Sequence, residues 1–294
     1  MKSGFVAILG MPNVGKSTLL NSILKEKVSI VSPKPQTTRN KILGIYNDAD
    51  SQIVFIDTPG IHNSHNKLDE YMDKAIVTAK EDVDVLLFVI DGKKKITDNV
   101  IETLNKYTKN IKNIVLVVNK IDDTTYEKLY PELAKCNNLE NVKDIVPVSA
   151  LRGKNIPELL KVIKGYLTDD VKYFDDDVYT DKPLKFLVAE IIREKSLWLL
   201  QDELPHGIAI EIVRFNEGDL YEIDADIILE KSSHKQIVIG KNGEMLKNIG
   251  TKSRIEIEKL VDAKVMLKLF VKVREDWRGN SNTLKSLGYN HNDL

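Results

Sequence analysis

The chain has 294 residues, with 43 lysines and arginines against 44 aspartates and glutamates, for a formal net charge of -1. This length suffices for two domains that each bury a core, and the near-zero charge means that any basic surface for an anionic partner must be local. Its longest apolar runs, such as residues 85–90, are far shorter than the roughly 20 residues of a membrane-spanning helix. We therefore expect a globular cytoplasmic protein, in which the single cysteine, Cys136, forms no internal disulfide.

Up to about residue 168, short apolar runs alternate with amphipathic helical stretches. This alternation predicts an α/β domain, a mostly parallel sheet with helices on both faces. Residues 41–57 differ, because two strand-like runs flank the turn-forming residues 47–50 and leave no room for a crossover helix. They predict an antiparallel hairpin at one edge of the sheet.

Residues 10–17, GMPNVGKS, fit the phosphate-loop pattern G-x-x-x-x-G-K-[ST], directly after a predicted strand and before a predicted helix. In such a loop the backbone amides surround the phosphates, Lys16 reaches the β and γ oxygens, and the Ser17 hydroxyl binds Mg²⁺. The expected nucleotide contacts are Gly10, Met11, Pro12, Asn13, Val14, Gly15, Lys16, Ser17 and Thr18. The motif alone does not separate ATP from GTP.

Residues 117–122, VVNKID, indicate the base. The Asp122 carboxylate is a two-lobed acceptor that matches the N1–H and amino groups of guanine, whereas adenine offers an acceptor at N1. We expect Asn119 to tie the loop together and the aliphatic stem of Lys120 to lie along the base. Weaker support comes from residues after the next strand, whose amides would lie near the guanine oxygen: Ser149, Ala150 and Leu151. The sequence therefore predicts GTP and GDP as ligands.

Residues 57–60, DTPG, end the second strand of the hairpin. We expect Asp57 to hold Mg²⁺ through a water and the Gly60 amide to meet the γ-phosphate. The expected nucleotide contacts of this segment are Asp57, Thr58, Pro59, Gly60 and Ile61. Many GTPases have a water-orienting glutamine where Ile61 stands, and isoleucine makes no hydrogen bond, so the attacking water must be positioned by other means.

Residues 28–41 form a polar, proline-punctuated loop with two adjacent threonines, Thr37 and Thr38. One of their hydroxyls would complete the Mg²⁺ shell when the γ-phosphate is present and so order the loop, which is the physical basis of a switch. Thr38 is the favoured candidate and Thr37 the alternative. The predicted metal ligands are Ser17, Thr38 and Asp57.

The acidic, proline-ended residues 169–183 predict a linker between a first domain, 1–168, and a second domain, 184–276. The second domain is expected to be α+β, and residues 277–294 form a C-terminal tail. Its predicted elements are a strand over 184–193, a helix or turn over 196–207, strands over 208–215 and 221–230, a helix over 244–261 and a strand over 264–273.

Residues 240–243, GKNG, stand between the strand-like residues 236–239 and the predicted helix. A G-x-x-G loop lets a nucleic-acid backbone approach closely and clamps about four nucleotides in K-homology (KH) modules. Residues 231–254 carry six basic residues and one acid, whereas residues 216–230 carry six acids and no base. This polarity favours single-stranded RNA as a ligand. The predicted RNA contacts are Ile239, Gly240, Lys241, Asn242, Gly243, Lys247, Lys252 and Arg254.

Together these motifs resemble the bacterial Era GTPases over essentially the whole chain, including KPQTTRNKILGI (34–45), VIGKNGEMLKNIG (238–250), VKVREDWR (271–278) and LGY (287–289). The resemblance implies a P-loop GTPase domain followed by a KH domain. It also implies slow, Mg²⁺-dependent GTP hydrolysis and docking near the 3′ end of 16S ribosomal RNA (rRNA) in the 30S subunit, and it leaves open a peripheral association with the inner membrane. It marks Asn13 as the ligand of a potassium ion. The residues expected to act in hydrolysis are Asn13, Lys16, Thr38 and Gly60.

Two other classes of function make different demands on the sequence. A GTP-dependent RNA-modifying enzyme needs a nucleophile or metal centre in the second domain, whereas Cys136 lies in the first and the five histidines show no metal-ligand spacing. A basic amphipathic helix with exposed aromatic residues would favour the hypothesis of a membrane or cell-division scaffold, and residues 244–262 do not provide one. The leading hypothesis is a GTP switch whose second domain binds RNA, with no DNA partner expected.

Overall fold

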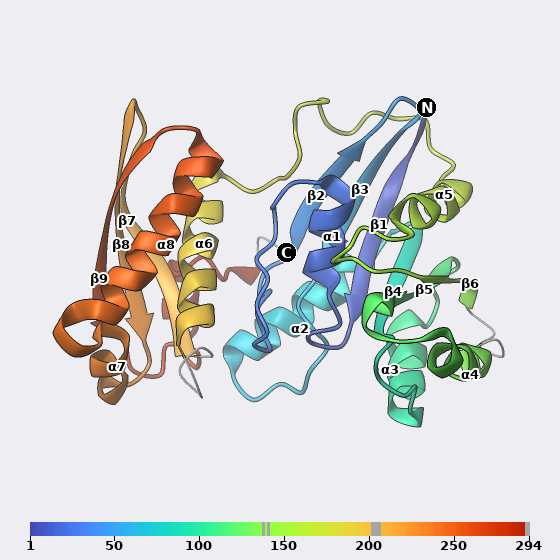
Figure 1. Ribbon diagram of the computed structural model, residues 1–294, viewed down its shortest axis with the longest axis horizontal. Coiled ribbons are helices and arrows are strands. Elements are labelled where there is room, and N and C mark those ends of the chain that lie inside the picture. Colours follow the sequence, from blue (N-terminus) through green and yellow to red (C-terminus); the bar gives the residue numbers. More distant parts are fainter. Residues whose placement is uncertain (137–138, 140–141, 201–206, 292–294) are drawn as a thin grey trace.

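The computed structural model describes residues 1–136, 139, 142–200 and 207–291, which form two lobes joined by an extended segment (Figure 1). The first lobe contains a six-stranded sheet of order β2-β3-β1-β4-β5-β6. Only β2 and β3 pair in antiparallel fashion among these neighbours, so the edge hairpin predicted from the sequence is confirmed. The strands are β1 (Lys2–Gly10), β2 (Ile42–Asn47), β3 (Ser51–Asp57), β4 (Val85–Asp91), β5 (Ile114–Asn119) and β6 (Val142–Pro147).

Side-chain alternation along β1 supplies a core on each face of this sheet. Val6 and Ile8 belong to one buried cluster, whereas Ala7 and Leu9 belong to another. The first cluster contains residues of α1 (Lys16–Leu24) and α5 (Ile156–Tyr166). The second contains residues of α2 (Lys67–Ala79), α3 (Asp98–Thr108) and α4 (Tyr126–Cys136). The parallel strands end at a common edge of the sheet, where the loops carrying the predicted motifs gather.

The second lobe contains a three-stranded sheet of order β7-β8-β9. Strands β7 (Ile208–Asn216) and β8 (Leu220–Leu229) are antiparallel, and β9 (Lys264–Val273) is parallel to β8. Its helices are α6 (Leu184–Leu199), α7 (Lys235–Ile239) and α8 (Glu244–Val261). Helix α6 lies between this sheet and the first lobe (Figure 1). The predicted classes, α/β followed by a smaller α+β unit, are confirmed.

Two segments that the sequence pattern assigned to strands are helical, so those predictions were wrong. Residues 184–193 belong to α6, which is buried on two sides because it packs on its own sheet through Val188, Ile191 and Ile192 and also faces the first lobe. Burial on two sides hides the helical period of apolar residues. Residues 236–239 lie in α7, which has five residues, a length at which a short apolar run does not distinguish helix from strand. Of the helix or turn predicted over 196–207, residues 196–199 belong to α6, and residues 201–206 lie outside the described residues.

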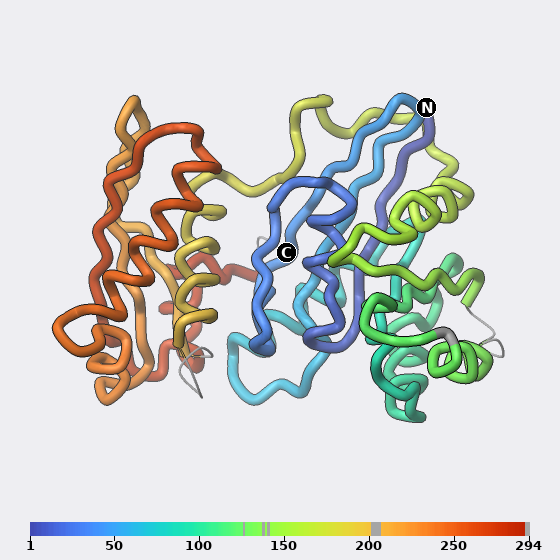
Figure 2. Tube along the Cα trace, in the orientation of Figure 1, coloured from blue at the N-terminus to red at the C-terminus, as the bar shows by residue number. Residues whose placement is uncertain are grey.

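The segment 169–183 runs along the first lobe rather than crossing directly to the second (Figure 2). The Ser3 amide donates to the Asp169 carbonyl oxygen (2.9 Å), and the Ile45 amide donates to the Tyr179 carbonyl oxygen (3.0 Å). Gln52 binds the segment between these points through the Phe174 backbone. The predicted linker is therefore held by hydrogen bonds at both ends and in the middle.

Residues 277–294, expected as a tail, contribute to a cluster between the lobes, and they include helix α9 (Ser281–Ser286). This interlobe cluster contains Leu68, Tyr71 and Met72 of α2, Ala209 of β7, Ile228 of β8, and Trp277, Leu284 and Tyr289. Arg39 enters it from the loop 28–41: its Nη1 atom donates to the Ile208 carbonyl oxygen (2.7 Å), and its guanidinium lies 5.6 Å from the centre of the Trp277 ring. The C-terminal segment thus joins both lobes.

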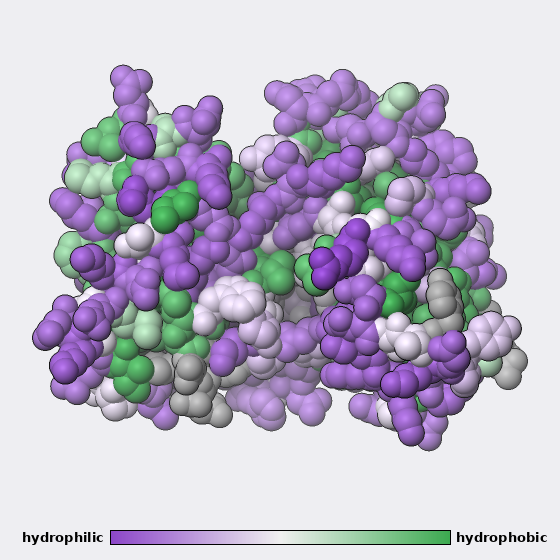
Figure 3. All heavy atoms as spheres, viewed as in Figure 1, coloured by the Kyte–Doolittle hydropathy of each residue, from purple (hydrophilic) through white to green (hydrophobic). Residues whose placement is uncertain are grey.

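The surface is mainly hydrophilic on the face shown in Figure 3, with apolar side chains scattered over both lobes and a hollow between them. Among the described residues, no helix has both the length and the apolar character that crossing a membrane requires.

Candidate functional site

The phosphate loop connects β1 to α1, which places its amides at the N-terminus of a helix. Neighbouring atoms leave no room for a Cβ atom at two positions of this loop, which explains why glycine stands there. Gly15 has φ 96°, and a Cβ atom there would lie 2.3 Å from the side chain of Asn119. A Cβ atom on Gly10 would lie 2.3 Å from the Val89 carbonyl oxygen. The loop therefore has the compact backbone that an anion-binding turn needs.

Lys16 lies inside this loop. Its ammonium group donates to the carbonyl oxygens of Gly10 (3.0 Å) and Met11 (3.1 Å). Burial lowers the pKa of Lys16 to about 8, and the negative charge of Asp57 opposes this effect. A phosphate in the loop would favour the charged form further, because an opposite charge nearby stabilises it. Lys16 can therefore supply a concentrated positive charge to a bound phosphate.

Three side-chain oxygens from different segments meet beside Lys16. The Ser17 hydroxyl donates to Asp57 Oδ2 (2.7 Å) and lies 2.8 Å from the Thr38 hydroxyl. Ser29 also donates to Asp57 Oδ2 (2.8 Å), and burial raises the pKa of Asp57. The other carboxylate oxygen, Oδ1, is buried with no hydrogen-bond partner among the described residues. A buried orphan oxygen next to two hydroxyls fits a hard cation such as Mg²⁺.

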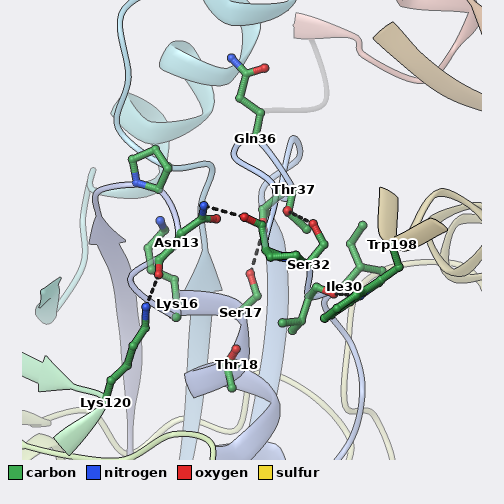
Figure 4. Close-up of a pocket in the computed structure, with 16 residues that line it drawn as sticks. Asn13, Lys16, Ser17, Thr18, Ile30, Ser32, Gln36, Thr37, Lys120 and Trp198 are labelled. Carbon is green, nitrogen blue, oxygen red and sulfur yellow. Dashed lines mark hydrogen bonds between the residues drawn. The ribbon is translucent and has the colours of Figure 1, made fainter. Parts of the chain in front are cut away.

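Thr37 is oriented away from these oxygens. Its hydroxyl donates to the Lys34 carbonyl oxygen (2.6 Å) and lies 2.7 Å from Ser32 Oγ, which closes a turn within the loop (Figure 4). Of the two threonines between which the sequence left a choice, Thr38 is the one that contacts the Ser17–Asp57 pair.

The DTPG segment packs against the phosphate loop through its backbone. The Ile61 amide donates to the Gly10 carbonyl oxygen (3.1 Å), and a Cβ atom on Gly60 would lie 2.9 Å from Pro12 Cα. The Ile61 side chain is buried in the core, and as an aliphatic group it offers no hydrogen bond to an attacking water. The Thr58 hydroxyl donates to a carbonyl oxygen of β1 (2.8 Å) and so holds the segment to the sheet.

Asn119 connects the loop after β5, which carries the residues predicted to bind guanine, to the phosphate loop, as the sequence predicts. Its Nδ2 atom donates to the Val14 carbonyl oxygen (2.9 Å), and its Oδ1 atom accepts from the amides of Lys120 (2.8 Å) and Ala150 (2.9 Å). The Lys120 ammonium group donates to the Asn13 carbonyl oxygen (2.6 Å). The loops after β1, β5 and β6 therefore form one hydrogen-bonded unit.

The other residues predicted around the base lie near this unit but differ in exposure. Asp122 is exposed in a short 3₁₀ turn, Ile121–Asp123. Leu151 is also exposed, whereas Ser149 is buried and its hydroxyl accepts from the Arg152 amide (3.1 Å). The Ala150 amide, which was expected near the guanine oxygen, donates to Asn119 in this structure.

A cavity of about 380 Å³ opens between the phosphate loop, the loop 28–41 and the DTPG segment (Figure 4). Its lining includes nine of the predicted residues: Pro12, Asn13, Gly15, Lys16, Ser17, Thr18, Thr38, Gly60 and Lys120. The predicted residues outside the lining are Gly10, Met11, Val14, Asp57, Thr58, Pro59, Ile61, Asn119, Asp122, Ser149, Ala150 and Leu151.

The cavity wall also contains residues that the motifs did not single out. Most belong to the proline-punctuated loop: Ile30, Val31, Ser32, Pro33 and Gln36, beside Thr37, the alternative metal-binding threonine. Their place beside two prolines and the threonine pair was the available signal. Trp198 comes from α6 of the second lobe, and no local pattern links it to a phosphate loop.

The G-x-x-G loop lies between α7 and α8. Gly240 has φ 75°, and a Cβ atom there would lie 2.7 Å from the Cβ atom of Met245. Gly243 has φ 79° and caps α8, with open space where its Cβ atom would stand. Lys241 and Asn242 are exposed at the tip. The loop therefore presents bare backbone and one lysine to a ligand, as close approach of a nucleic-acid backbone requires.

A groove of about 370 Å³ continues from this loop between α8 and β9. Lys247 and Arg254 line it from one face of α8, and Arg254 also pairs with Glu258 (2.9 Å). Lys252 is exposed outside the groove lining, and Ile239 at the end of α7 is half-buried. The sequence reasoning missed the rest of the lining, Leu246, Gly250, Thr251, Leu267 and Leu269, although the helical spacing of 243, 247, 250 and 254 was a usable signal.

A metal centre and a reactive cysteine are two features that an RNA-modifying enzyme could use. The described part of the chain includes no cluster of three or more histidine, cysteine, aspartate or glutamate side chains able to hold a metal ion. Cys136 is buried, and burial raises the pKa of its thiol, which disfavours the reactive thiolate.

Two family models match the chain. The model described as "50S ribosome-binding GTPase" matches residues 5–120, and the model described as "KH domain" matches residues 203–278. Among curated proteins, GTPase Era of Clostridium botulinum (strain Eklund 17B / Type B) is 49% identical over 290 residues, covering 98% of each chain. GTPase Era of Clostridioides difficile (strain 630) is 48% identical over 297 residues, covering 98% of this chain and 99% of its own.

Two solved structures resemble both lobes together. One is an Aquifex aeolicus Era variant bound to GDP·AlF4⁻, and the other is Era in complex with MgGDPNP and nucleotides 1506–1542 of 16S ribosomal RNA. Each has a TM-score of 0.95 and 39% sequence identity, and the match covers 98% of this chain and 99% of the other.

Proposed function

The chain belongs to the GTPase Era family, and from this premise we propose that it is a GTP-hydrolysing switch that binds single-stranded RNA during small-subunit assembly. One observation carries the proposal: a single chain contains two different sites. In the first lobe, Ser17, Thr38 and Asp57 meet beside Lys16 at a cavity. In the second lobe, an exposed G-x-x-G loop continues into a groove lined by basic residues. The RNA-bound relative supports the 3′ region of 16S rRNA, in the 30S subunit, as the partner.

GTP binds with its phosphates at the N-terminus of α1 and its guanine at the loop after β5. The amides of the phosphate loop and the Lys16 ammonium group contact the β- and γ-phosphates. Asp122 accepts from guanine, and its exposed carboxylate is free to turn toward the base because the 3₁₀ turn stands at the surface. Asn119 keeps this loop in register with the phosphate loop.

Ser17, Thr38 and Asp57 are the residues that would hold Mg²⁺, which when bound neutralises negative charge on the phosphate oxygens. Thr38 differs from the other two because it belongs to the loop 28–41 and not to the sheet or to α1. Its position therefore depends on how that loop is held, which gives the site two states, with and without the γ-phosphate.

Ile61 stands where many GTPases have a water-orienting glutamine, and we infer that a potassium ion supplies charge beside the γ-phosphate. In support, the Asn13 amide group lies 3.0 Å from the Pro33 carbonyl oxygen at the cavity edge, so rotation of that amide presents two oxygens to a monovalent cation. Turnover is expected to be several-fold faster in potassium than in sodium at matched ionic strength, and Asn13→Ala should abolish the difference. Equal turnover of the parent protein in the two salts would contradict the inference.

Single-stranded RNA binds across the G-x-x-G loop and the groove beside α8. The exposed Lys241 and the groove residues Lys247 and Arg254 face the backbone phosphates, while Leu267 and Leu269 of β9 offer apolar surface to bases. Lys252 adds positive charge outside the groove.

A cytoplasmic location is part of the proposal, and a peripheral association with the inner membrane stays a prediction. Sedimentation of the protein with membranes at low and high salt tests it, because an electrostatic attachment weakens as salt rises.

Base specificity gives the sharpest test of the proposed function. Asp122→Asn should lower GTP affinity about ten- to a hundredfold, because hydrogen bonds to a charged group contribute roughly 1.5–3 kcal/mol. The variant should gain affinity for xanthosine triphosphate, whose 2-oxo group accepts from an amide. Asp123→Asn is the matched control, since Asp123 is also exposed in the same turn and pairs with Lys93 (3.0 Å). Calorimetric titration showing unchanged GTP affinity for Asp122→Asn would rule out the guanine assignment.

A further inference from the structure

Helix α6 of the second lobe holds the loop 28–41 of the first lobe at two points. The Val31 amide donates to Glu194 Oε1 (2.9 Å), and the Val31 carbonyl oxygen accepts from Trp198 Nε1 (2.8 Å). Glu194 and Trp198 are four residues apart in α6 and so share one face of the helix. The Arg193 guanidinium donates to the Thr37 carbonyl oxygen farther along the loop. Both hydrogen-bonding groups of the Val31 backbone are thus bound by the second lobe.

Trp198 also reaches the nucleotide cavity. It is the one cavity-lining residue that comes from the second lobe within the described part of the chain. Its side chain remains 57% exposed although its ring nitrogen is hydrogen-bonded, so much of the indole surface lies outside the core. In Figure 4 the ring stands beside Ile30 and on the opposite side of the cavity from Lys120. The other tryptophan, Trp277, is fully buried in the interlobe cluster.

The order of residues around the cavity indicates which part of a nucleotide would meet the indole ring. Lys16 and Thr38 mark the phosphate end, and Lys120 marks the base end. Ser29, which contacts Asp57, directly precedes the wall made by Ile30, Val31 and Trp198. The wall thus begins next to the side-chain oxygens of the predicted metal site and lies across the cavity from Lys120 (Figure 4), along the path that the sugar of a nucleotide would take between the two ends.

We propose that Trp198 forms the outer wall of the ribose half of the guanine-nucleotide site, so that the second lobe completes a site built mainly by the first. This inference rests on the proposed function. An indole face buries apolar surface when a ribose packs against it, and such a contact slows release of the nucleotide. The wall also limits the space around the ribose hydroxyls, so the site discriminates against bulky ribose substituents.

The first experiment measures release of GDP from the full chain by stopped-flow mixing with excess unlabelled nucleotide. Trp198→Ala is expected to raise the GDP dissociation rate by roughly three- to tenfold, the range for loss of one aromatic contact. Phe270→Ala is the matched control, because Phe270 is an exposed aromatic residue of the second lobe that does not line the cavity, and its dissociation rate should equal that of the parent.

A comparison of two nucleotides separates a ribose contact from a general loosening of the lobes. The parent should bind GDP carrying an N-methylanthraniloyl group on its 2′ or 3′ oxygen more weakly than GDP, and Trp198→Ala should remove most of that difference. A purely structural role would change both affinities by the same factor. An unchanged ratio in Trp198→Ala would overturn the inference.

Tryptophan emission provides a readout in a variant that keeps a ring at this position. GDP should change the emission of the parent, and Trp198→Phe should lose that change, because Trp277 is buried away from the cavity. A GDP-dependent change that persists in Trp198→Phe would overturn the inference. A parent protein that bound no guanine nucleotide would instead contradict the proposed function.

Discussion

His62 links the DTPG segment to the loop 28–41 through the carboxylate of Asp69. Its Nδ1 atom lies 2.8 Å from the Gly60 carbonyl oxygen, and its Nε2 atom lies 3.3 Å from Asp69 Oδ1. Gln36 of the loop 28–41 donates to the same Asp69 oxygen (3.0 Å). Both neighbours of the imidazole are acceptors, so the doubly protonated ring suits the position best.

The charge of His62 should therefore make stability depend on pH. The contact with Asp69 raises the pKa of His62 above its ordinary value of 6.5, with burial opposing and Asp73 adding to the increase. A raised folded-state pKa stabilises the fold fully below the unfolded-state pKa, and this stabilisation is lost as pH rises through the folded-state value. The free energy of unfolding is expected to fall as pH rises from 6.5 through the raised pKa.

Urea unfolding at a series of pH values measures this slope. His62→Gln should reduce the slope of the unfolding free energy against pH by about the contribution of one bound proton. His65→Gln, at an exposed neighbouring histidine, should leave the slope as in the parent. A parent whose stability rises over this range, or a His62→Gln variant with the parent's slope, would contradict the role assigned to His62.

At the scale of single residues, motifs predicted the site where chemistry fixes both residue type and spacing. The Ser17 hydroxyl and the Asp57 carboxylate meet as expected, because their segments leave adjacent parallel strands at the same edge. The choice between Thr37 and Thr38 depends on which hydroxyl closes a turn with Lys34, a tertiary detail that spacing does not encode. His62 and Asp69 gave no signal, since a histidine near an aspartate in sequence has no fixed meaning.

Within the second lobe, the G-x-x-G loop can be tested with variants that share the same backbone strain. Gly243→Asp places negative charge in the open space where a backbone phosphate would lie, so binding of single-stranded RNA should be lost. Gly243→Ala is the matched control, because it carries the same cost of a side chain at φ 79° without the charge. Nucleotide affinity should be unchanged in both variants, since the loop lies outside the nucleotide cavity.

Salt dependence shows how Lys241 contributes to the same interaction. Lys241→Ala removes one contact to phosphate, so the slope of log affinity against log salt should flatten by roughly 0.7 for a single strand. All RNA sequences should weaken similarly. RNA binding by Gly243→Asp as tight as by Gly243→Ala, measured by fluorescence anisotropy at several salt concentrations, would show that the loop is only a turn.

At the scale of elements, prediction succeeded where one periodicity dominates a segment. The bounds of α8 and β9 coincide with the predicted ranges 244–261 and 264–273, because a helix with one buried stripe and an edge strand each show a single period. Helix α6 failed for the opposite reason. Charged residues such as Arg193 and Glu194 are buried in it by partners on the loop 28–41, and a local pattern does not contain those partners.

For the molecule as a whole, Trp277 is the largest fully buried side chain, and it stands in the cluster shared by both lobes. Trp277→Ala should lower the free energy of unfolding by about 3–5 kcal/mol, the usual cost of removing a large aromatic side chain from a core. Tyr130→Ala, at a 76% exposed aromatic residue, is the control and should change stability by less than about 0.5 kcal/mol. Thermal unfolding followed by calorimetry measures both, and near-equal stabilities of the two variants would contradict the role of the cluster.

The arrangement of the lobes was beyond the reach of the sequence. Arg39 contacts both Ile208 and Trp277, each more than a hundred residues away along the chain, and nothing in their local sequence marks them as partners. The sequence predicted two units and their order, whereas the docked geometry depends on contacts that form only after both units have folded.

Thr38 and Arg39 are adjacent in the chain but have different partners. The hydroxyl of Thr38 lies beside Ser17 at the predicted metal site, and the guanidinium of Arg39 lies in the interlobe cluster. Their Cα atoms stand 3.8 Å apart across one rigid peptide plane, so neither can shift far without pulling the other. We infer that this peptide couples loss of the γ-phosphate at Thr38 to movement of Arg39 in the interlobe cluster. The time for which the γ-phosphate persists would then determine how long the two lobes stay in contact, so that hydrolysis limits the duration of one orientation of the RNA-binding lobe.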